Sequence, residues 1–206
     1  MAHEITRILD WDVAQRVRPG ESDSGDRYLV QAVPCGMLVA VVDGLGHGPS
    51  AAEAADLAVA EMARMNGGSL VNVVQRCHAR LQRTRGVVLS LALFDVMHDT
   101  MAWLSVGNVE GRLWCLNSRR MHQALLLRGG VVGDHVPHLV PAIVPVGYGD
   151  LLILATDGIN SNFADDVKLS APARQIAERI VERHWQRTDD ALVLVARYAH
   201  AHRQVG

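Results

Sequence analysis

The sequence predicts an α+β fold in which helices cover antiparallel β-sheets. Most apolar runs are of strand length, and several follow one another directly, separated by short turns rich in His, Asp, Gly, Asn and Ser. Consecutive strands with such turns pair as antiparallel hairpins. Three other segments carry apolar residues at the spacing of a helix face. No internal repeat or linker interrupts this order, so we expect one domain covering residues 1–206.

The expected strands are the apolar runs at residues 5–13, 28–33, 37–42, 87–96, 101–106, 111–116, 123–127, 151–155 and 191–197. The run at 37–42 is continuously apolar, which is typical of a strand buried on both faces. Residues 129–149 contain five glycines and three prolines. This composition predicts an irregular excursion between two strands.

The expected helices are the amphipathic segments at residues 50–66, 70–83 and 172–185. Ser50, with Glu53 three residues later, can form a capping box at the start of the first helix. Its apolar stripe stops near Asn66, where two glycines follow.

Composition and charge exclude several classes of protein. The 20 basic and 22 acidic residues give a formal net charge of -2, which argues against a broad basic face for nucleic acid. The longest apolar runs are too short to cross a bilayer. The charged N-terminal segment lacks the apolar core and small-residue cleavage site of a secretory signal. We therefore expect a cytoplasmic protein that binds neither nucleic acid nor membranes.

Cys35, Cys77 and Cys115 are an odd number of cysteines without a CxxC pair. This pattern argues against both a disulfide framework and a thiolate zinc site. We expect three reduced, buried thiols.

Acidic residues stand at four expected strand ends. Two apolar runs end in Asp-Gly, at Asp43 and at Asp157, while Asp26 precedes one strand and Asp189 and Asp190 precede another. An isolated Asp-Gly pair is more often only a turn. Four acidic ends that meet in space would repel one another unless cations neutralise them, and hard carboxylate oxygens suit Mg²⁺ or Mn²⁺.

Four stretches carry a family resemblance: VVDGLGHGPSAAEAA, LSVGN, LLILATDGI and TDDALVLVA. In this order and spacing they resemble the metal-dependent protein serine/threonine phosphatases of the PPM (type 2C) family. Within that family they look most like the SpoIIE-type branch and its small stressosome feedback phosphatases. The resemblance runs from about residue 20 to residue 198, and DGLGHG is its most specific element.

The resemblance implies a β-sandwich of two antiparallel sheets with helices on both outer faces, and a site for two Mn²⁺ or Mg²⁺ ions. Asp43 matches the aspartate that bridges both ions, and Gly44 matches the glycine whose carbonyl binds one of them. Asp157 and Asp189 match the remaining acidic ligands, and Asp26, also counted as a metal ligand, matches the aspartate of the branch's Ser-Gly-Asp element. Asp43 and Asp157 would thereby hold the water that attacks phosphorus.

His47 has two interpretations. It can protonate the leaving serine oxygen as a general acid, or it can be a loop histidine that bonds to the backbone. Eukaryotic members of the family also hold phosphate with an arginine that precedes the first metal aspartate. Arg16, Arg18 and Arg27 stand in this part of the chain, and none of them matches that arginine.

The expected function is hydrolysis of phosphoserine or phosphothreonine. By resemblance, the substrates would be phosphorylated STAS-domain proteins of a stressosome, of the RsbS and RsbR type. The alternative is a catalytically inactive phosphatase fold that binds the same partners. A third possibility is a phosphatase of small phosphomonoesters that uses the same metals.

Overall fold

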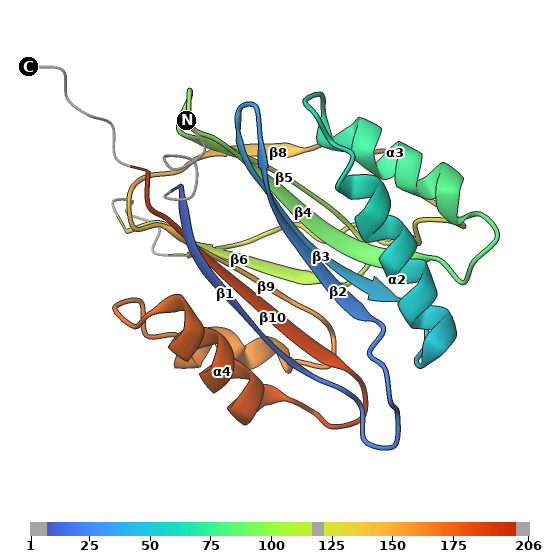
Figure 1. The fold of residues 1–206 in the computed structure, drawn as a ribbon. Coiled ribbons are helices and arrows are strands. Elements are labelled where there is room, and N and C mark those ends of the chain that lie inside the picture. Colours follow the sequence, from blue (N-terminus) through green and yellow to red (C-terminus); the bar gives the residue numbers. More distant parts are fainter. Residues whose placement is uncertain (1–7, 117–121, 201–206) are drawn as a thin grey trace, which may run out of the picture.

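Two antiparallel β-sheets stacked face to face form the centre of the computed structural model, which describes residues 8–116 and 122–200 (Figure 1). In spatial order, the first sheet consists of β1 (Leu9–Arg16), β10 (Ala191–Tyr198), β9 (Leu151–Ala155), β6 (Glu110–Trp114) and β7 (His122–Ala124). The second consists of β2 (Asp26–Val33), β3 (Gly36–Gly44), β4 (Val87–Asp95), β5 (Thr100–Val106) and β8 (Ala142–Pro145).

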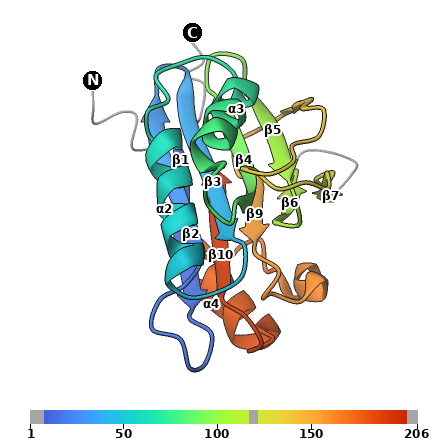
Figure 2. The ribbon, with the colours of Figure 1, turned by 90° about the vertical axis from the view of Figure 1, so that its right-hand side faces the viewer.

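Helices cover both outer faces of this sandwich. Helices α2 (Pro49–Met62) and α3 (Leu70–Leu81) lie against the second sheet, and α4 (Ala173–His184) lies against the first (Figure 2). A short 3₁₀ helix, η1 (Ser161–Asp166), connects β9 to α4. The predicted α+β sandwich of two antiparallel sheets with helices on both outer faces is therefore confirmed.

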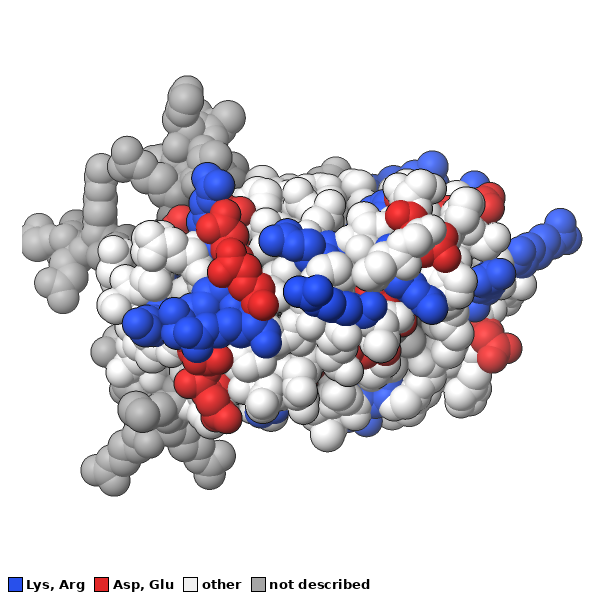
Figure 3. All heavy atoms as spheres, turned by 90° about the horizontal axis from the view of Figure 1, so that it is seen from below, with Lys and Arg blue, Asp and Glu red and all other residues white. Residues whose placement is uncertain are grey.

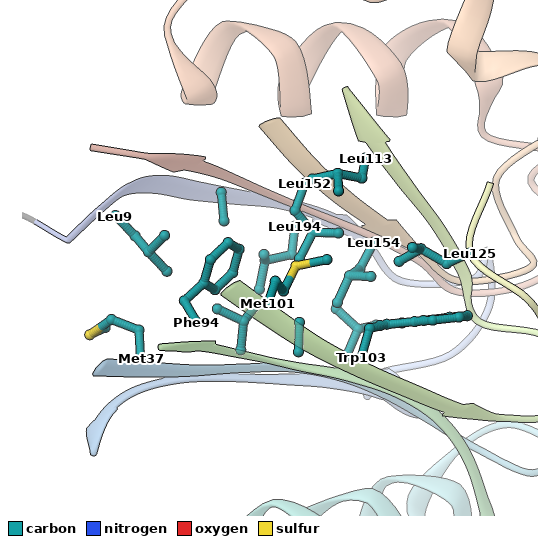
Figure 4. Packing of buried hydrophobic residues seen from close by; sticks show 14 of the residues in the cluster. Leu9, Met37, Phe94, Met101, Trp103, Leu113, Leu125, Leu152, Leu154 and Leu194 are labelled. Carbon is teal, nitrogen blue, oxygen red and sulfur yellow. The ribbon is translucent and has the colours of Figure 1, made fainter. Parts of the chain in front are cut away.

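Three apolar layers hold the sheets and helices together. The central layer lies between the sheets and is formed by large side chains such as Phe94, Trp103 and Leu154 (Figure 4). The other two lie between each sheet and its helices. Strands β3, β9 and β10 therefore have apolar side chains on both faces, which explains their continuous apolar runs. These buried strands give the residues at their ends rigid positions.

The start of α2 differs from the prediction. The helix begins at Pro49, and Gly48 is its N-cap residue with φ +72. Proline suits the first helical position because its φ is already helical and its missing N–H needs no partner there. Ser50 is exposed within the first turn, and in the described helix no side chain caps the N-terminus. The predicted capping box of Ser50 and Glu53 is therefore wrong.

A side-chain cap occurs instead at α3, where it was not predicted. The Ser69 hydroxyl accepts a hydrogen bond from the Asn72 backbone N–H at 3.3 Å. Two glycines precede Ser69 and break the chain between α2 and α3.

The segment 129–149 is less irregular than predicted, because residues 142–145 form β8 at the edge of the second sheet. Pro145 is compatible with this strand, since an edge strand leaves one row of backbone groups without a partner. Smaller differences concern boundaries. β7 covers residues 122–124 rather than 123–127, and β1 covers 9–16 rather than 5–13, of which residues 5–7 lie outside the described chain.

The three cysteines are free thiols, as predicted. Cys77 and Cys115 are buried, but Cys35 is partly exposed, so the expectation of burial is wrong for that residue. Among the described residues, no helix has the length and apolar character needed to span a membrane.

The surface around α4 carries charges of both signs (Figure 3). Arg174 pairs with Glu178 at 2.8 Å along the helix, and Arg183 pairs with Asp166 of η1 at 2.9 Å. Basic side chains on this face therefore have acidic partners close by.

We expect Ser69→Ala to lower the free energy of unfolding by about 1 kcal/mol, because the substitution removes the N-cap of α3. Ser50→Ala is the matched control and should change it by less than about 0.5 kcal/mol, since Ser50 is exposed inside a helix. Urea unfolding of both variants measures the difference. Equal effects would contradict the assignment of the cap to Ser69.

Candidate functional site

The acidic strand ends of the two sheets meet at one end of the sandwich. Asp26 at the start of β2 is the register partner of Asp43 in β3. Asp157 follows β9, and Asp189 precedes β10, which pairs with β9. The Thr156 hydroxyl donates a hydrogen bond to Asp26 Oδ2 at 2.8 Å and so joins the end of one sheet to the end of the other.

A hollow of about 440 Å³ opens at this end of the sandwich. Asp43, Asp157 and Asp189 stand in its wall. The rest of the wall is apolar, amide or glycine: Leu45, Gly46, Val88, Gly107, Asn108, Gly129, Gly130 and Val131. Four glycines leave backbone rather than side chains at the surface, so a polar group of a ligand can approach closely.

Asp26 lies behind this wall rather than in it. Its side chain is only 2% exposed. Burial, together with the charge of Asp190, raises the pKa of Asp26 to about 8, against the lowering effect of the Thr156 hydrogen bond.

Asp43 has a pKa that is raised further than that of Asp26. Its side chain is partly exposed to the hollow, yet withdrawal from bulk water raises its pKa to about 9, with Asp26, Asp157 and Asp189 adding to the shift. A carboxyl whose ionised form is this unfavourable requires a positive charge beside it to stay ionised at neutral pH.

Asp157 is oriented by hydrogen bonds from two neighbouring segments. The Asn108 side-chain amide donates to Asp157 Oδ2 at 2.8 Å, and the Gln186 amide donates to the Asp157 carbonyl at 3.0 Å. Burial and Asp189 raise the pKa of Asp157, while the Asn108 hydrogen bond lowers it. Asn108 therefore holds one carboxylate oxygen and leaves the other for a ligand.

Asp190 differs from its neighbour Asp189. Asp190 is 4% exposed, and both of its oxygens accept backbone hydrogen bonds, from Arg18 N–H at 2.8 Å and from Gly25 N–H at 2.7 Å. It thereby anchors the loop between β1 and β2. Asp189 stands in the wall of the hollow and accepts a hydrogen bond from the Asp190 N–H at 2.9 Å.

Gly44 has a packing reason to be glycine. A Cβ on this residue would lie 2.1 Å from the backbone carbonyl oxygen of Ala51 in α2. Its N–H donates to the Gly25 carbonyl at 3.1 Å. Glycine thus allows the start of α2 to pack closely against the end of β3.

The donor set fits a hard divalent cation by its chemistry. Asp26, Asp43, Asp157, Asp189 and Asp190 supply oxygens only, and within residues 8–116 and 122–200 none of these side chains pairs with a Lys, Arg or His. Positive charge is therefore what the cluster lacks. Yet in the same ranges no group of three or more His, Cys, Asp or Glu side chains is close enough to chelate one ion directly. Backbone carbonyls and water would have to complete any coordination.

The other residues considered from the sequence lie away from the hollow's wall. The His47 Nδ1 atom contacts Glu21 Oε1 at 2.6 Å, and both belong to loops beside the site. Arg27 pairs with Asp56 at 2.6 Å and with Asp23 at 3.2 Å.

Two residues of the site were missed by sequence reasoning. Asn108 and Thr156 each stand at the end of a strand, in LSVGN and in ATDG. These motifs were noted in the sequence, but neither residue was given a role there. The signal was present, since both are polar residues at the end of an apolar run, Thr156 directly after it and Asn108 after one glycine.

Comparison with known proteins gives consistent matches. A family model described as stage II sporulation protein E (SpoIIE) matches residues 34–201. Phosphoserine phosphatase RsbX of Bacillus subtilis (strain 168) is 23% identical over 179 residues, which cover 86% of this chain and 89% of RsbX.

Two solved structures share the fold. One is a chain from work on the bacterial stressosome as a modular system adapted to control secondary messenger signaling. It is 34% identical with a TM-score of 0.84, over 92% of this chain and 99% of that chain. The other is RsbX in complex with magnesium, 20% identical with a TM-score of 0.81, over 92% of this chain and 94% of that chain.

Divalent metal should stabilise the fold, because an ion that binds only the native state adds to the free energy of unfolding and also relieves the repulsion among the carboxylates. At 100 times its dissociation constant, Mn²⁺ should add about 2.7 kcal/mol and raise the melting temperature by roughly 5–10 °C relative to EDTA. Differential scanning calorimetry gives both values. The cluster does not bind metal if the melting temperature stays constant up to millimolar Mn²⁺ and Mg²⁺.

Proposed function

The chain belongs to the SpoIIE family, as expected from its motifs, and we propose on this basis that it is a metal-dependent protein serine/threonine phosphatase. The observation that carries the proposal is the set of Asp43, Asp157 and Asp189 in the wall of one hollow. Burial first, and repulsion among the carboxylates second, raise the pKa values of Asp43 and Asp157, and bound cations would offset both.

We assign the metal ligands as follows. Asp43, which shares the hollow's wall with Asp157 and Asp189, would contact both of two Mn²⁺ or Mg²⁺ ions, with the Gly44 carbonyl on one of them. Asp157 and Asp189 reach the hollow from the opposite sheet. Asp26 completes the set from behind Asp43. Because this site takes residues from both sheets, we infer that the two sheets act as one catalytic domain.

The residues of the chain would orient the reactants. Bound divalent ions supply a water acidic enough to attack phosphorus at neutral pH. Asn108 fixes the Asp157 carboxylate, and Thr156 fixes Asp26 across the two sheets. The buried strand β3 fixes the position of Asp43 in the hollow's wall. Through these contacts, Asp43 and Asp157 position the attacking water. His47 stands on the loop directly after Asp43, where its contact with Glu21 would orient the ring for proton donation to the leaving oxygen.

The proposed substrates are phosphoserine or phosphothreonine residues of stressosome proteins with STAS domains, of the RsbS and RsbR type. Two relatives support this choice: RsbX is a phosphoserine phosphatase, and a 34% identical chain comes from work on the stressosome. We place the protein in the cytoplasm, where its three free cysteines stay reduced.

The central experiment measures phosphate release from a phosphorylated STAS-domain protein with Mn²⁺, with Mg²⁺ and in EDTA. We expect turnover that depends on metal. A folded protein that binds this substrate but is inactive with both metals would instead be the inactive binding module. Faster turnover of sugar phosphates than of the phosphoprotein would favour the small-molecule phosphatase.

Asp43→Asn keeps the shape of the side chain but removes the charge expected to contact both ions. We expect activity to fall by orders of magnitude at ordinary Mn²⁺ concentrations. The melting temperature in EDTA should not fall, because the amide also removes a source of carboxylate repulsion. A fully active Asp43→Asn protein would show that the ligand assignment is wrong even if the family is right.

Asp189→Asn and Asp190→Asn form a matched pair with different expected effects. Asp189→Asn should abolish most of the activity and leave stability in EDTA unchanged. Asp190→Asn should lower the free energy of unfolding by about 1–3 kcal/mol, since one of two backbone N–H groups loses its acceptor, and should keep more activity per folded molecule. Urea unfolding and initial rates at saturating Mn²⁺ separate the two. The reverse ranking of activities would exchange their roles.

A further inference from the structure

We infer that Arg85 binds the phosphoryl group of the substrate at the mouth of the acidic hollow. This inference rests on the proposed phosphatase function and assigns the phosphate-binding arginine that the N-terminal part of the sequence does not supply. Arg85 stands in the loop between α3 and β4, far in sequence from Arg16, Arg18 and Arg27.

The guanidinium group of Arg85 lies against the wall of the hollow. A Cβ placed on Gly46 would be 2.7 Å from Arg85 Nη1 and 3.8 Å from its Cζ. Gly46 has φ +88 and lines the same hollow as Asp43, Asp157 and Asp189. The charged end of Arg85 is therefore beside the site, and glycine at position 46 leaves the space that it occupies.

The loop that carries Arg85 is fixed on both sides. The Thr84 hydroxyl donates to the Leu81 carbonyl at 2.8 Å and accepts from the Gly86 N–H at 3.0 Å. The Gly86 carbonyl accepts from the Leu45 N–H at 3.1 Å, which ties this loop to the one that follows Asp43. The backbone of residue 85 thus keeps a constant position relative to the metal-binding aspartate, although its side chain is exposed.

Arg85 also lacks an acidic partner within the described ranges, where no ion pair or side-chain hydrogen bond involves its guanidinium. Several other arginines of the described chain do have acidic partners, although Arg83 does not. Arg27 is held by Asp56, and Arg183 is held by Asp166. An arginine beside an acidic cluster that pairs with none of its members is available for an anionic ligand.

A basic group at this position would offset the repulsion between the carboxylates and a phosphate that enters the hollow. The hollow's wall contains three carboxylates and, among the described residues that form it, no Lys or Arg. A dianionic phosphate that approaches would be repelled by any carboxylate charge left uncompensated. The planar guanidinium offers a fork of donors that matches two phosphoryl oxygens. Arg85 would bind the phosphate from the rim while the carboxylates hold the cations below.

The test compares Arg85→Gln and Arg85→Lys with Arg83→Gln in the full chain loaded with Mn²⁺. Arg83 is also exposed and has no ion pair in the described chain, so Arg83→Gln removes the same charge as Arg85→Gln and is the matched control. KM and kcat are measured with a phosphorylated STAS-domain protein and with para-nitrophenyl phosphate. The dissociation constant of inorganic phosphate is measured separately by calorimetry.

We expect Arg85→Gln to raise KM for both substrates, and the dissociation constant of phosphate, by about tenfold or more, the value of one lost charge-assisted hydrogen bond. Arg85→Lys should recover part of the affinity, and Arg83→Gln should stay within about twofold of wild type. An effect of Arg85→Gln on the phosphoprotein alone overturns the inference, because the arginine then contacts the polypeptide rather than the phosphoryl group.

Failure of the inference can be distinguished from failure of the proposed function. Wild-type turnover with Mn²⁺ decides whether the protein is a phosphatase. If it is inactive, calorimetry with inorganic phosphate still tests Arg85, and equal affinities of wild type and Arg85→Gln, or no phosphate binding at all, overturn the assignment.

Discussion

Carboxylates from two different sheets are held close together at one end of this sandwich, and their repulsion is the constraint on which the site depends. Asp26 and Asp43 come from adjacent strands of one sheet, while Asp157 and Asp189 come from the other. Burial is the main cause of the raised pKa values of Asp26 and Asp43, and repulsion from the neighbouring carboxylates, which separation would relieve, adds to it. The fold prevents that separation, because the apolar layer between the sheets holds their strands together.

The hydrogen bonds around the cluster divide its members into two kinds. Asp190 has both oxygens occupied by backbone N–H groups, and Asp26 accepts from Thr156, so these two carboxylates also serve as structural joints. Asp43 and Asp189 reach the hollow, and among the described residues their side chains bond at most to a neighbouring backbone group. Carboxylate oxygens without partners at the opening of the hollow remain available to an ion, while the structural joints behind them keep the strand ends in place.

The sequence predicted those parts of the structure that follow from local patterns. Strand β3 was visible as an apolar run, and Asp43 at its end stood out because a charge there interrupts that pattern. The joining of Asp26 to Thr156 could not be predicted, because it depends on how two sheets stack over residues 130 positions apart. Local reasoning also failed at α2, where Ser50 with Glu53 indicated a capping box. The helix begins instead at Pro49. Its N-terminus packs against Gly44 there, which leaves Ser50 in solvent.

Arg85 illustrates a further limit of sequence reasoning and its physical cause. Its neighbours in the chain form an ordinary helix end followed by a strand, and no motif marks it. Its significance comes from the Leu45–Gly86 hydrogen bond and from the absence of a side chain on Gly46, which together bring a positive charge to the edge of a negatively charged hollow. The carboxylates of the hollow do not neutralise the Arg85 guanidinium by direct contact, because Arg85 pairs with none of them in the described chain. Opposite charges kept separate in this way would let one site bind cations at its base and an anion at its rim, as the proposed metal-dependent hydrolysis requires.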